Sequence, residues 1–303
     1  MSATAARDVS AALTKARSLI GILPRLVRHR GEIAVVEPGG TVGLDEESRA
    51  AFAGDIALLR HVGLRPVVVH GDGLRPGRES ARPDPPYTAR TDRNAASAPE
   101  TADTVRMVFA GRVQHGLVGL INRHGPLAVG ITGEDADTFT TAGQWTLGGG
   151  GPVDTGGPGG IVRVNPGLVR SLVADGRIPV ISAVARGAGR SHPLDPGLAA
   201  AALAAALGAG TLTVLTGTEV PYRPRPAGNG TAGRLTAREL EALLPELDGG
   251  LLPAMTGCLH AVRHGVGSAR VVDGRVRHAV LTELLCDEGT GTVIVPDGAA
   301  PTP

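Results

Sequence analysis

Residues 64–73, LRPVVVHGDG, set the architecture that we expect for this 303-residue chain. A run of apolar residues leads directly into two glycines, and this pattern is typical of a buried strand that ends in a tight turn. Residues 33–40, IAVVEPGG, have the same order. Strands that end in glycine turns and alternate with helical stretches predict βαβ units and an α/β fold: an open, mainly parallel sheet sandwiched by helices.

The rest of the chain alternates in the same way. An amphipathic helix with Pro24 as a potential kink is expected over residues 8–29, before the main body. Further helices are expected at 45–61, 101–122, 165–175, 196–207, 236–247, 251–264 and 279–285. Further strands are expected at 127–131, 178–184, 212–216, 269–272, 275–278 and 292–295.

The composition excludes several classes of protein. A net charge of +1 and 2% aromatic residues offer neither a single-signed field nor stacking platforms, so we expect no nucleic-acid partner. Cys258 and Cys286 are too few for a disulfide framework, and we expect no metal site. No apolar run of about 18 residues occurs, which predicts no membrane span and a cytoplasmic protein.

The glycine-rich tract 147–160, LGGGGPVDTGGPGG, could be a phosphate-binding loop or a hairpin connection. It lacks the GxxxxGK[ST] order of a phosphate-binding loop, and no helix is expected directly after it, which favours the connection.

Three long segments resemble one known family: 120–142 (LINRHGPLAVGITGEDADTFTTA), 153–182 (VDTGGPGGIVRVNPGLVRSLVADGRIPVIS) and 271–294 (VVDGRVRHAVLTELLCDEGTGTVI). The chain resembles the N-acetylglutamate kinases of the amino-acid kinase family, in particular the arginine-regulated branch with an added N-terminal helix. The resemblance implies an oligomerisation helix at residues 1–30, an N-lobe for the acyl amino acid at 31–184 and a C-lobe for nucleotide at 185–303.

The resemblance also implies phosphoryl transfer from ATP, with Mg²⁺, to the carboxylate of an acyl amino acid. Such transfer depends on cations that neutralise the phosphoryl oxygens. The two lysines of the family correspond here to Glu37 in VVEPGG and to Ala254 in GGLLPAM, and Lys15 is the one lysine of the chain. The lost lysine positions predict a weakened hold on phosphate.

Other family site positions correspond to residues of both lobes. The resemblance implies a catalytic role for Asp195, and His192 beside it could act as a new acid or base; an N-cap of the following helix explains Asp195 equally well. The remaining positions are substrate-binding Gly71, Gly73, Ser191 and either Arg90 or Arg93, and nucleotide-binding Gly39, Gly40 and Gly217.

The C-terminal segment resembles the effector pocket of the arginine-regulated branch. Its positions are His278, Glu283 and Gly289, and Glu283 could pair with a guanidinium in bidentate fashion. Arg25 stands where that branch has a tyrosine and would compete for the same acidic pocket. The N-terminal helix implies a homo-oligomer, either a dimer or a hexamer.

Three functions therefore remain open. The first is a diverged N-acetylglutamate kinase homologue that keeps the fold and ligand cleft but is deficient in phosphorylation, either a pseudokinase or a protein repurposed for a related amino acid. The second is a working kinase of arginine biosynthesis in which Arg186, Arg190 or Arg223 replaces the lysines. The third is an arginine-binding regulatory subunit.

Overall fold

The computed structural model describes residues 3–39, 45–71, 107–141, 160–187, 190–217, 233–247, 251–286 and 289–299. Its α-helices are α1 (Ala3–His29), α2 (Glu46–His61), α4 (Gln114–Asn122), α5 (Gly167–Ala174), α6 (Pro196–Leu207), α7 (Ala237–Leu243), α8 (Leu251–Arg263) and α9 (Ala279–Leu285). A π-helix, η2 (Met107–Val113), leads into α4, and short 3-10 turns are η3 (Asp135–Asp137) and η5 (Leu244–Glu246).

The main sheet has eight strands in the order β10-β12-β11-β9-β1-β2-β6-β3. Six of them are mutually parallel, and β12 runs antiparallel to β11. Their bounds are β1 (Ile33–Glu37), β2 (Arg65–His70), β3 (Ala128–Thr132), β6 (Ile178–Ser182), β9 (Thr211–Thr216), β10 (Gly233–Thr236), β11 (Ser268–Asp273) and β12 (Thr292–Val295). The mainly parallel α/β sheet expected from the sequence is confirmed.

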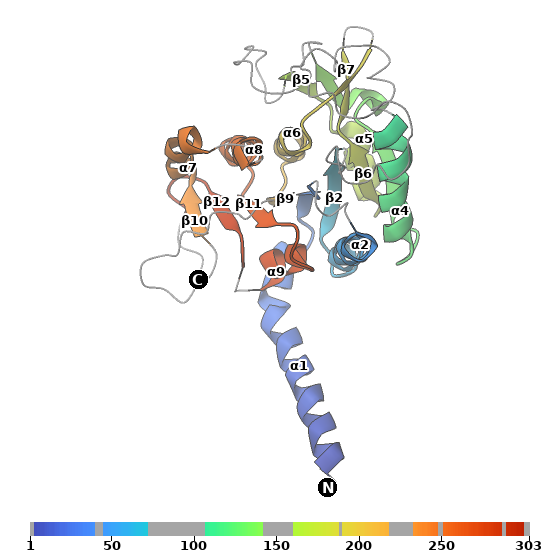
Figure 1. Ribbon diagram of the computed structural model, residues 1–303, viewed down its shortest axis with the longest axis vertical. Coiled ribbons are helices and arrows are strands. Elements are labelled where there is room, and N and C mark those ends of the chain that lie inside the picture. Colours follow the sequence, from blue (N-terminus) through green and yellow to red (C-terminus); the bar gives the residue numbers. More distant parts are fainter. Residues whose placement is uncertain are drawn as a thin grey trace.

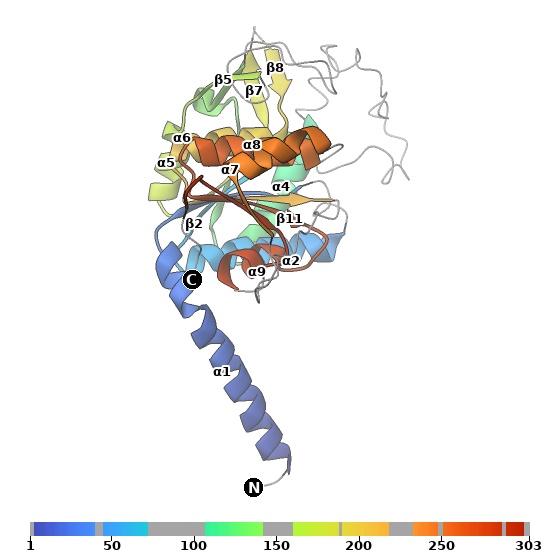
Figure 2. The same ribbon diagram turned by 90° about the vertical axis from the view of Figure 1, so that its left-hand side faces the viewer.

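Helices cover both faces of this sheet (Figure 1). Alternate strand residues explain why: in β1, Val35 joins a core cluster with α6 and α8, while Ala34 and Val36 join a second cluster with α2, α4 and α9. Strands that are buried on both faces give the continuous apolar runs seen in the sequence. Figure 2 shows α6 and α8 on one side of the sheet and α2 and α9 on the other.

A second, four-stranded sheet stands beside the main one. It contains β4 (Phe139–Thr141), β5 (Ile161–Val164), β7 (Val184–Gly187) and β8 (Arg190–Pro193), in the order β5-β4-β7-β8. The sequence predicts one strand over 178–184, whereas the structure divides this region at Ala183 between the two sheets. The chain then turns through β8 directly into α6.

Helix α1 extends away from the body, with the N-terminus at its far end (Figure 1). It continues through Pro24, and near its C-terminal end Ile22 and Leu26 pack against the core. Other apolar side chains on α1 are more than half exposed: Leu13, Leu19, Ile20, Leu23 and Val27. Within the residues that the structure describes, none of the helices has the length and apolar character needed to cross a membrane.

The expected strand over residues 275–278 is wrong. The Asp273 carboxylate accepts hydrogen bonds from the Arg275 backbone and guanidinium, which closes a turn directly after β11. His278 then takes a left-handed conformation, with φ of 59°, at the start of α9. A carboxylate that bonds the amide two residues later stabilises a turn, so the chain does not extend here.

Candidate functional site

The candidate site lies at the carboxyl edge of the main sheet, where open α/β sheets bind ligands. Four sequence-predicted residues meet this edge because the strands that carry them are parallel neighbours. Glu37 ends β1 and Gly39 follows it by two residues, Gly71 follows β2, and Gly217 follows β9. The two glycine turns predicted from the sequence are therefore adjacent in space.

Both turns have room for glycine only. Gly39 has φ of +58°, and a Cβ placed on it would lie 1.8 Å from the Leu215 carbonyl oxygen, at the end of β9. A Cβ on Gly71 would lie 2.9 Å from Cγ of Pro196, the first residue of α6. The first turn is therefore pressed against β9 and the second against the start of α6.

Glu37 lies on the face of β1 that α6 and α8 cover. It shares a strand face with Val35, whose side chain packs in the cluster with α6 and α8, and it is 4% exposed. Its carboxylate accepts a hydrogen bond of 2.9 Å from the Gly39 backbone N–H. Burial raises the pKa of the Cys258 thiol, and the charge of Glu37 raises it further, which places the carboxylate near α8.

Ala254 lies one turn before Cys258 on the same helix and is buried. Helices α6 and α8 approach closely here, since a Cβ on Gly257 would lie 3.0 Å from the Gly197 carbonyl oxygen. A Cβ on Gly197 would lie 3.9 Å from the Ala254 Cα. The small side chain at Ala254 therefore belongs to a tight contact between α6 and α8.

Asp195 is the N-cap of α6. Its carboxylate accepts a hydrogen bond of 2.9 Å from the Leu198 N–H, and its backbone is extended. Burial raises the pKa of Asp195, while the amides of Leu198 and Gly197 oppose that rise. The helix-cap interpretation thus has a structural basis, and the catalytic role of Asp195 stays a prediction.

His70 is held as a neutral ring at the end of β2. Burial lowers the pKa of His70 to about 4, although the hydrogen bond to Gly71 opposes that shift. Because the Gly71 carbonyl oxygen can only accept, the His70 Nδ1 carries the proton of their 3.0 Å hydrogen bond. The ring therefore fixes the carbonyl of the second glycine turn.

Ser191 and His192 lie in β8 of the second sheet. The Ser191 hydroxyl donates to the Glu134 carboxylate at 2.7 Å, and the His192 Nε2 lies 3.0 Å from the Gly187 carbonyl oxygen. Arg186, on β7, forms an ion pair with Asp137 at 3.2 Å. The proposed binding and acid–base roles stay predictions, because the contacts found for these residues are within the second sheet and its loops.

The effector-like residues divide into two groups. Glu283, on α9, is 3% exposed, and its Oε1 accepts hydrogen bonds from the Thr290 N–H and, at 2.7 Å, from the Gly291 N–H. A Cβ on Gly289 would lie 2.8 Å from Glu283 Oε2, so these two predicted residues are neighbours. His278 instead bonds Asp55 of α2 through Nδ1 at 2.6 Å.

Arg270 is a buried cation near Glu283 that the sequence analysis missed. Burial lowers the pKa of Arg270, whereas the negative charge of Glu283 raises it. The charge of Arg25 lowers the same pKa, and that of Glu32 raises it. The Arg270 Nη1 donates to the hydroxyls of Thr211 and Ser268, at 2.6 and 2.8 Å. An arginine inside the apolar run of β11 is the signal that could have identified it.

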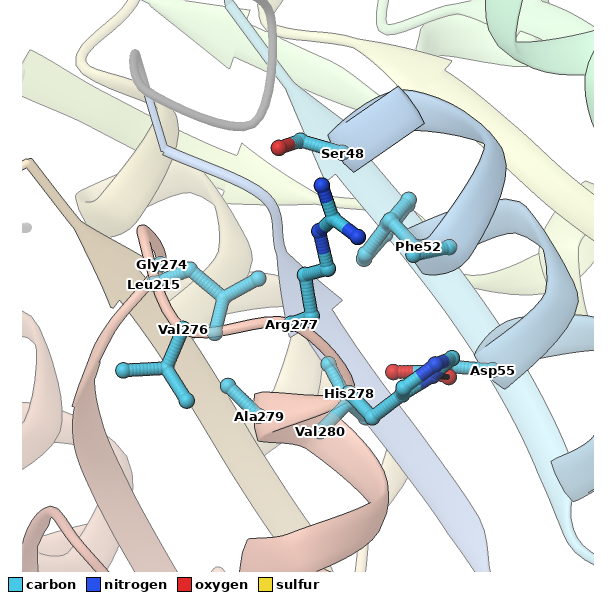
Figure 3. A pocket seen from close by; sticks show the side chains of 11 residues that line it. Ser48, Phe52, Asp55, Leu215, Gly274, Val276, Arg277, His278, Ala279 and Val280 are labelled. Carbon is cyan, nitrogen blue, oxygen red and sulfur yellow. Dashed lines mark hydrogen bonds and ion pairs between the residues drawn. The ribbon is translucent and has the colours of Figure 1, made fainter. Parts of the chain in front are cut away.

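A small pocket lies between α2 and α9, with His278 and Asp55 on one side (Figure 3). The Arg277 guanidinium points from it toward Ser48 at the start of α2 and pairs with Glu47. The pocket between α2 and α9 has a volume of about 20 Å³, which is room for little more than a water molecule. A larger cavity of about 140 Å³ lies next to α8, lined by Leu235, Leu243, Leu247 and Met255 together with Gly233, Arg234, Glu246 and Thr292.

Several predicted residues lie outside the described part of the chain: Gly40, Gly73, Arg90, Arg93 and Arg223, and nearly all of the tract 147–160. Gly217 is described and follows β9.

Among the described residues, no three His, Cys, Asp or Glu side chains gather as a metal site requires. His260, on α8, and His264, directly after this helix, stack with ring centroids 3.9 Å apart, a pair that the sequence analysis also missed.

Comparisons with known proteins agree with this architecture. The Amino acid kinase family matches residues 32–273. The acetylglutamate kinase of Streptomyces griseus subsp. griseus is 49% identical over 298 residues, covering 94% of this chain and 92% of the relative. That of Streptomyces avermitilis is 50% identical, covering 94% of both chains.

Solved structures show the same fold at low identity. N-acetylglutamate synthase from Neisseria gonorrhoeae, complexed with coenzyme A and N-acetyl-glutamate, has a TM-score of 0.67 at 20% identity over 94% of this chain. This chain spans 64% of that protein. Carbamate kinase from Giardia lamblia bound to AMP-PNP has a TM-score of 0.59 at 15% identity, covering 88% of this chain and 99% of the kinase.

Proposed function

Because this chain belongs to the amino acid kinase family, we propose that it is an acetylglutamate kinase-type phosphotransferase, which moves a phosphoryl group from ATP to the carboxylate of an N-acylated glutamate. The observation that carries the proposal is the 49% identity to a relative named acetylglutamate kinase over 94% of the chain. The second glycine turn, at Gly71, supports it, because a glycine there leaves the backbone free of side-chain bulk at the carboxyl edge.

The cleft fits different parts of a nucleotide unequally. The cavity of about 140 Å³ beside α8 is walled by leucines and Met255, which suits a flat base. The first glycine turn does not fit a phosphate, because the Glu37 carboxylate occupies the Gly39 amide and carries the same charge sign. An ATP phosphate is therefore disfavoured at this turn.

The cations for phosphate would have to come from arginines. Arg186 pairs with Asp137 on the second sheet, the side chain of Arg190 is not described, and Arg223 lies outside the described residues. A guanidinium can clamp a phosphate with two hydrogen bonds, so arginine can replace lysine in principle. The proposal requires at least one of these arginines to reach the cleft when nucleotide binds.

The test is an acylphosphate assay. Purified protein is incubated with Mg-ATP and N-acetylglutamate, and the acylphosphate is trapped with hydroxylamine. The proposal expects turnover between roughly 1 and 100 s⁻¹, the usual range for kinases. Hydroxamate no higher than in the reaction without protein would contradict it.

A second candidate is a homologue that has kept the cleft but lost efficient phosphorylation. Glu37 and Ala254, which the resemblance aligns with two lysines of the family, favour it: one is a buried acid and the other an apolar side chain in the α6–α8 contact. Removing one charge-stabilising donor typically costs about 10²–10³ in rate. If the hydroxamate assay is silent, the double variant Glu37→Lys and Ala254→Lys should restore measurable turnover; a silent double variant counts against this explanation.

We also propose that the protein forms a homo-oligomer through α1. Leu19, Ile20 and Val27 are each at least 66% exposed on a helix that extends away from its own body. Exposed apolar stripes of this kind commonly mark protein–protein contacts. Light scattering should show a dimer or a larger assembly, and Ile20→Glu with Leu23→Glu should give a monomer; a wild-type monomer would contradict the proposal.

A further inference from the structure

The Glu37 carboxylate is bonded to the glycine turn that directly follows its own strand. Glu37 is the last residue of β1, and its carboxylate folds forward onto the N–H of Gly39, two residues later, at 2.9 Å. Gly39 has φ of +58° and is pressed against the Leu215 carbonyl oxygen, so the turn cannot easily move away from the carboxylate. The acid and the amide therefore form one fixed unit at the carboxyl edge.

The surroundings hold the carboxylate in place. Glu37 is 4% exposed, so little water competes for the Gly39 amide. Its charge acts on the thiol of Cys258, which lies one helical turn from Ala254 on α8. The carboxylate thus lies between the first glycine turn and α8, at the sheet edge that the proposed function assigns to the nucleotide.

A glycine-turn amide after a strand is a donor suited to anions, because no side chain blocks the approach. Here the protein supplies its own anion to that donor. An incoming phosphate would have to displace a charge-assisted hydrogen bond and would also meet a charge of its own sign. Both effects disfavour phosphate at this turn, while neither penalises a neutral or cationic group.

We propose that Glu37 is the specificity-determining residue of the cleft: its carboxylate occupies the Gly39 amide as an internal anion and discriminates against phosphate groups. The inference rests on the proposed function only in taking this edge as the nucleotide site. It predicts that nucleotide affinity is limited by a side chain of the protein itself, and that the affinity rises when that side chain is changed.

The experiment measures the affinity of AMP-PNP and of inorganic tripolyphosphate by calorimetry, without any turnover. Glu37→Gln removes the charge but keeps an oxygen that can accept from Gly39, whereas Glu37→Val removes both. We expect dissociation constants to fall roughly tenfold for Glu37→Gln and further for Glu37→Val, since each tenfold step corresponds to about 1.4 kcal/mol.

The matched control is Glu32→Gln. Glu32 directly precedes β1 at its opposite end, where it bonds His29, so this variant makes the same charge change away from the cleft. We expect its affinity for both ligands to equal that of the wild type. A gain as large as that of Glu37→Gln would mean a general charge effect and would overturn the inference.

The inference and the proposed function fail in different ways. If neither Glu37 variant binds tripolyphosphate or AMP-PNP more tightly than the wild type, the inference is wrong, whatever the hydroxamate assay shows. If the variants gain affinity while the wild type makes no hydroxamate, the inference holds and the proposed function fails. Circular dichroism checks folding, and if Glu37→Val does not fold, the isosteric Glu37→Gln decides.

Discussion

Two buried glutamates, Glu37 and Glu283, do the same local chemistry at different places in the molecule. Each is less than 5% exposed, and each accepts hydrogen bonds from the backbone of a glycine-containing turn. Glu283 joins α9 to residues 290 and 291 and lies near the buried Arg270. Glu37 instead lies at the carboxyl edge, against the turn that follows its own strand.

The difference lies in what surrounds the carboxylate. Around Glu283, the Arg270 guanidinium bonds Thr211 and Ser268 at the first residues of β9 and β11, so this cluster belongs to the amino edge of the sheet. There a buried acid fastens a loop and is part of the packing. At the carboxyl edge, the Glu37 carboxylate instead bonds a turn that lies where a ligand would bind. The position in the sheet therefore separates the structural role of Glu283 from the role in ligand selection that we propose for Glu37.

The largest effect should come from Glu283→Ala. It leaves the amides of Thr290 and Gly291 without their acceptor and removes one of the negative charges that act on Arg270. A buried donor left unsatisfied costs about 1–3 kcal/mol, so for the two amides and the lost charge we expect a total loss of about 3–5 kcal/mol. Urea unfolding measures the loss. Glu241→Ala, which breaks an exposed ion pair with Arg263, is the control and should cost no more than about 1 kcal/mol. Equal losses of unfolding free energy for Glu283→Ala and Glu241→Ala would contradict the structural role of Glu283.

The two turns should respond differently to an added methyl group. Gly39→Ala forces an L-residue into φ of +58° and a Cβ to within 1.8 Å of a backbone carbonyl, so we expect a loss of about 3 kcal/mol. In Gly289→Ala the new Cβ meets only the end of the Glu283 side chain, at 2.8 Å, and we expect about 1 kcal/mol. Thermal unfolding of both variants tests the order, and a reversed order would contradict this account.

His70 should make the stability of the protein sensitive to acid. Its folded pKa of about 4 lies below the ordinary value of 6.5, so its contribution is fully present above pH 6.5 and is lost as the pH falls toward 4. Between pH 7 and pH 5 the free energy of unfolding should fall by about 2 kcal/mol from this group. His70→Asn should remove that part of the slope, and an unchanged slope would show that another group is responsible.

Asp195 should give the smallest effect. Asp195→Ala loses the N-cap of α6 and should cost about 1 kcal/mol at pH 7, whereas Asp195→Asn keeps a capping oxygen and should cost less. Because burial raises the folded pKa, the wild type loses stability as the pH rises from 3.8 through that raised pKa, and Asp195→Asn should not. Urea unfolding across this window is the measurement. A larger loss for Asn than for Ala would contradict the capping role.

The sequence was enough to predict the parallel sheet, since the apolar runs of β1, β2 and β9 are buried on both faces. It also located Glu37 and Gly71 at strand ends, because a glycine after such a run marks a turn. It could not show that His278 contacts Asp55, 223 residues away, and not Glu283. Nor could it reveal the second sheet, whose short strands hold Ser191 and His192, because four residues are too few for a clear period.

The contact between Gly197 and Gly257 has a consequence for motion. With the Gly197 carbonyl 3.0 Å from where a Cβ on Gly257 would lie, α6 and α8 cannot come closer, and sliding past each other would disrupt their packing. The two helices should therefore move together as one rigid unit. A change of shape on this side of the sheet should therefore come from the strand ends and from the segments that connect them to these helices.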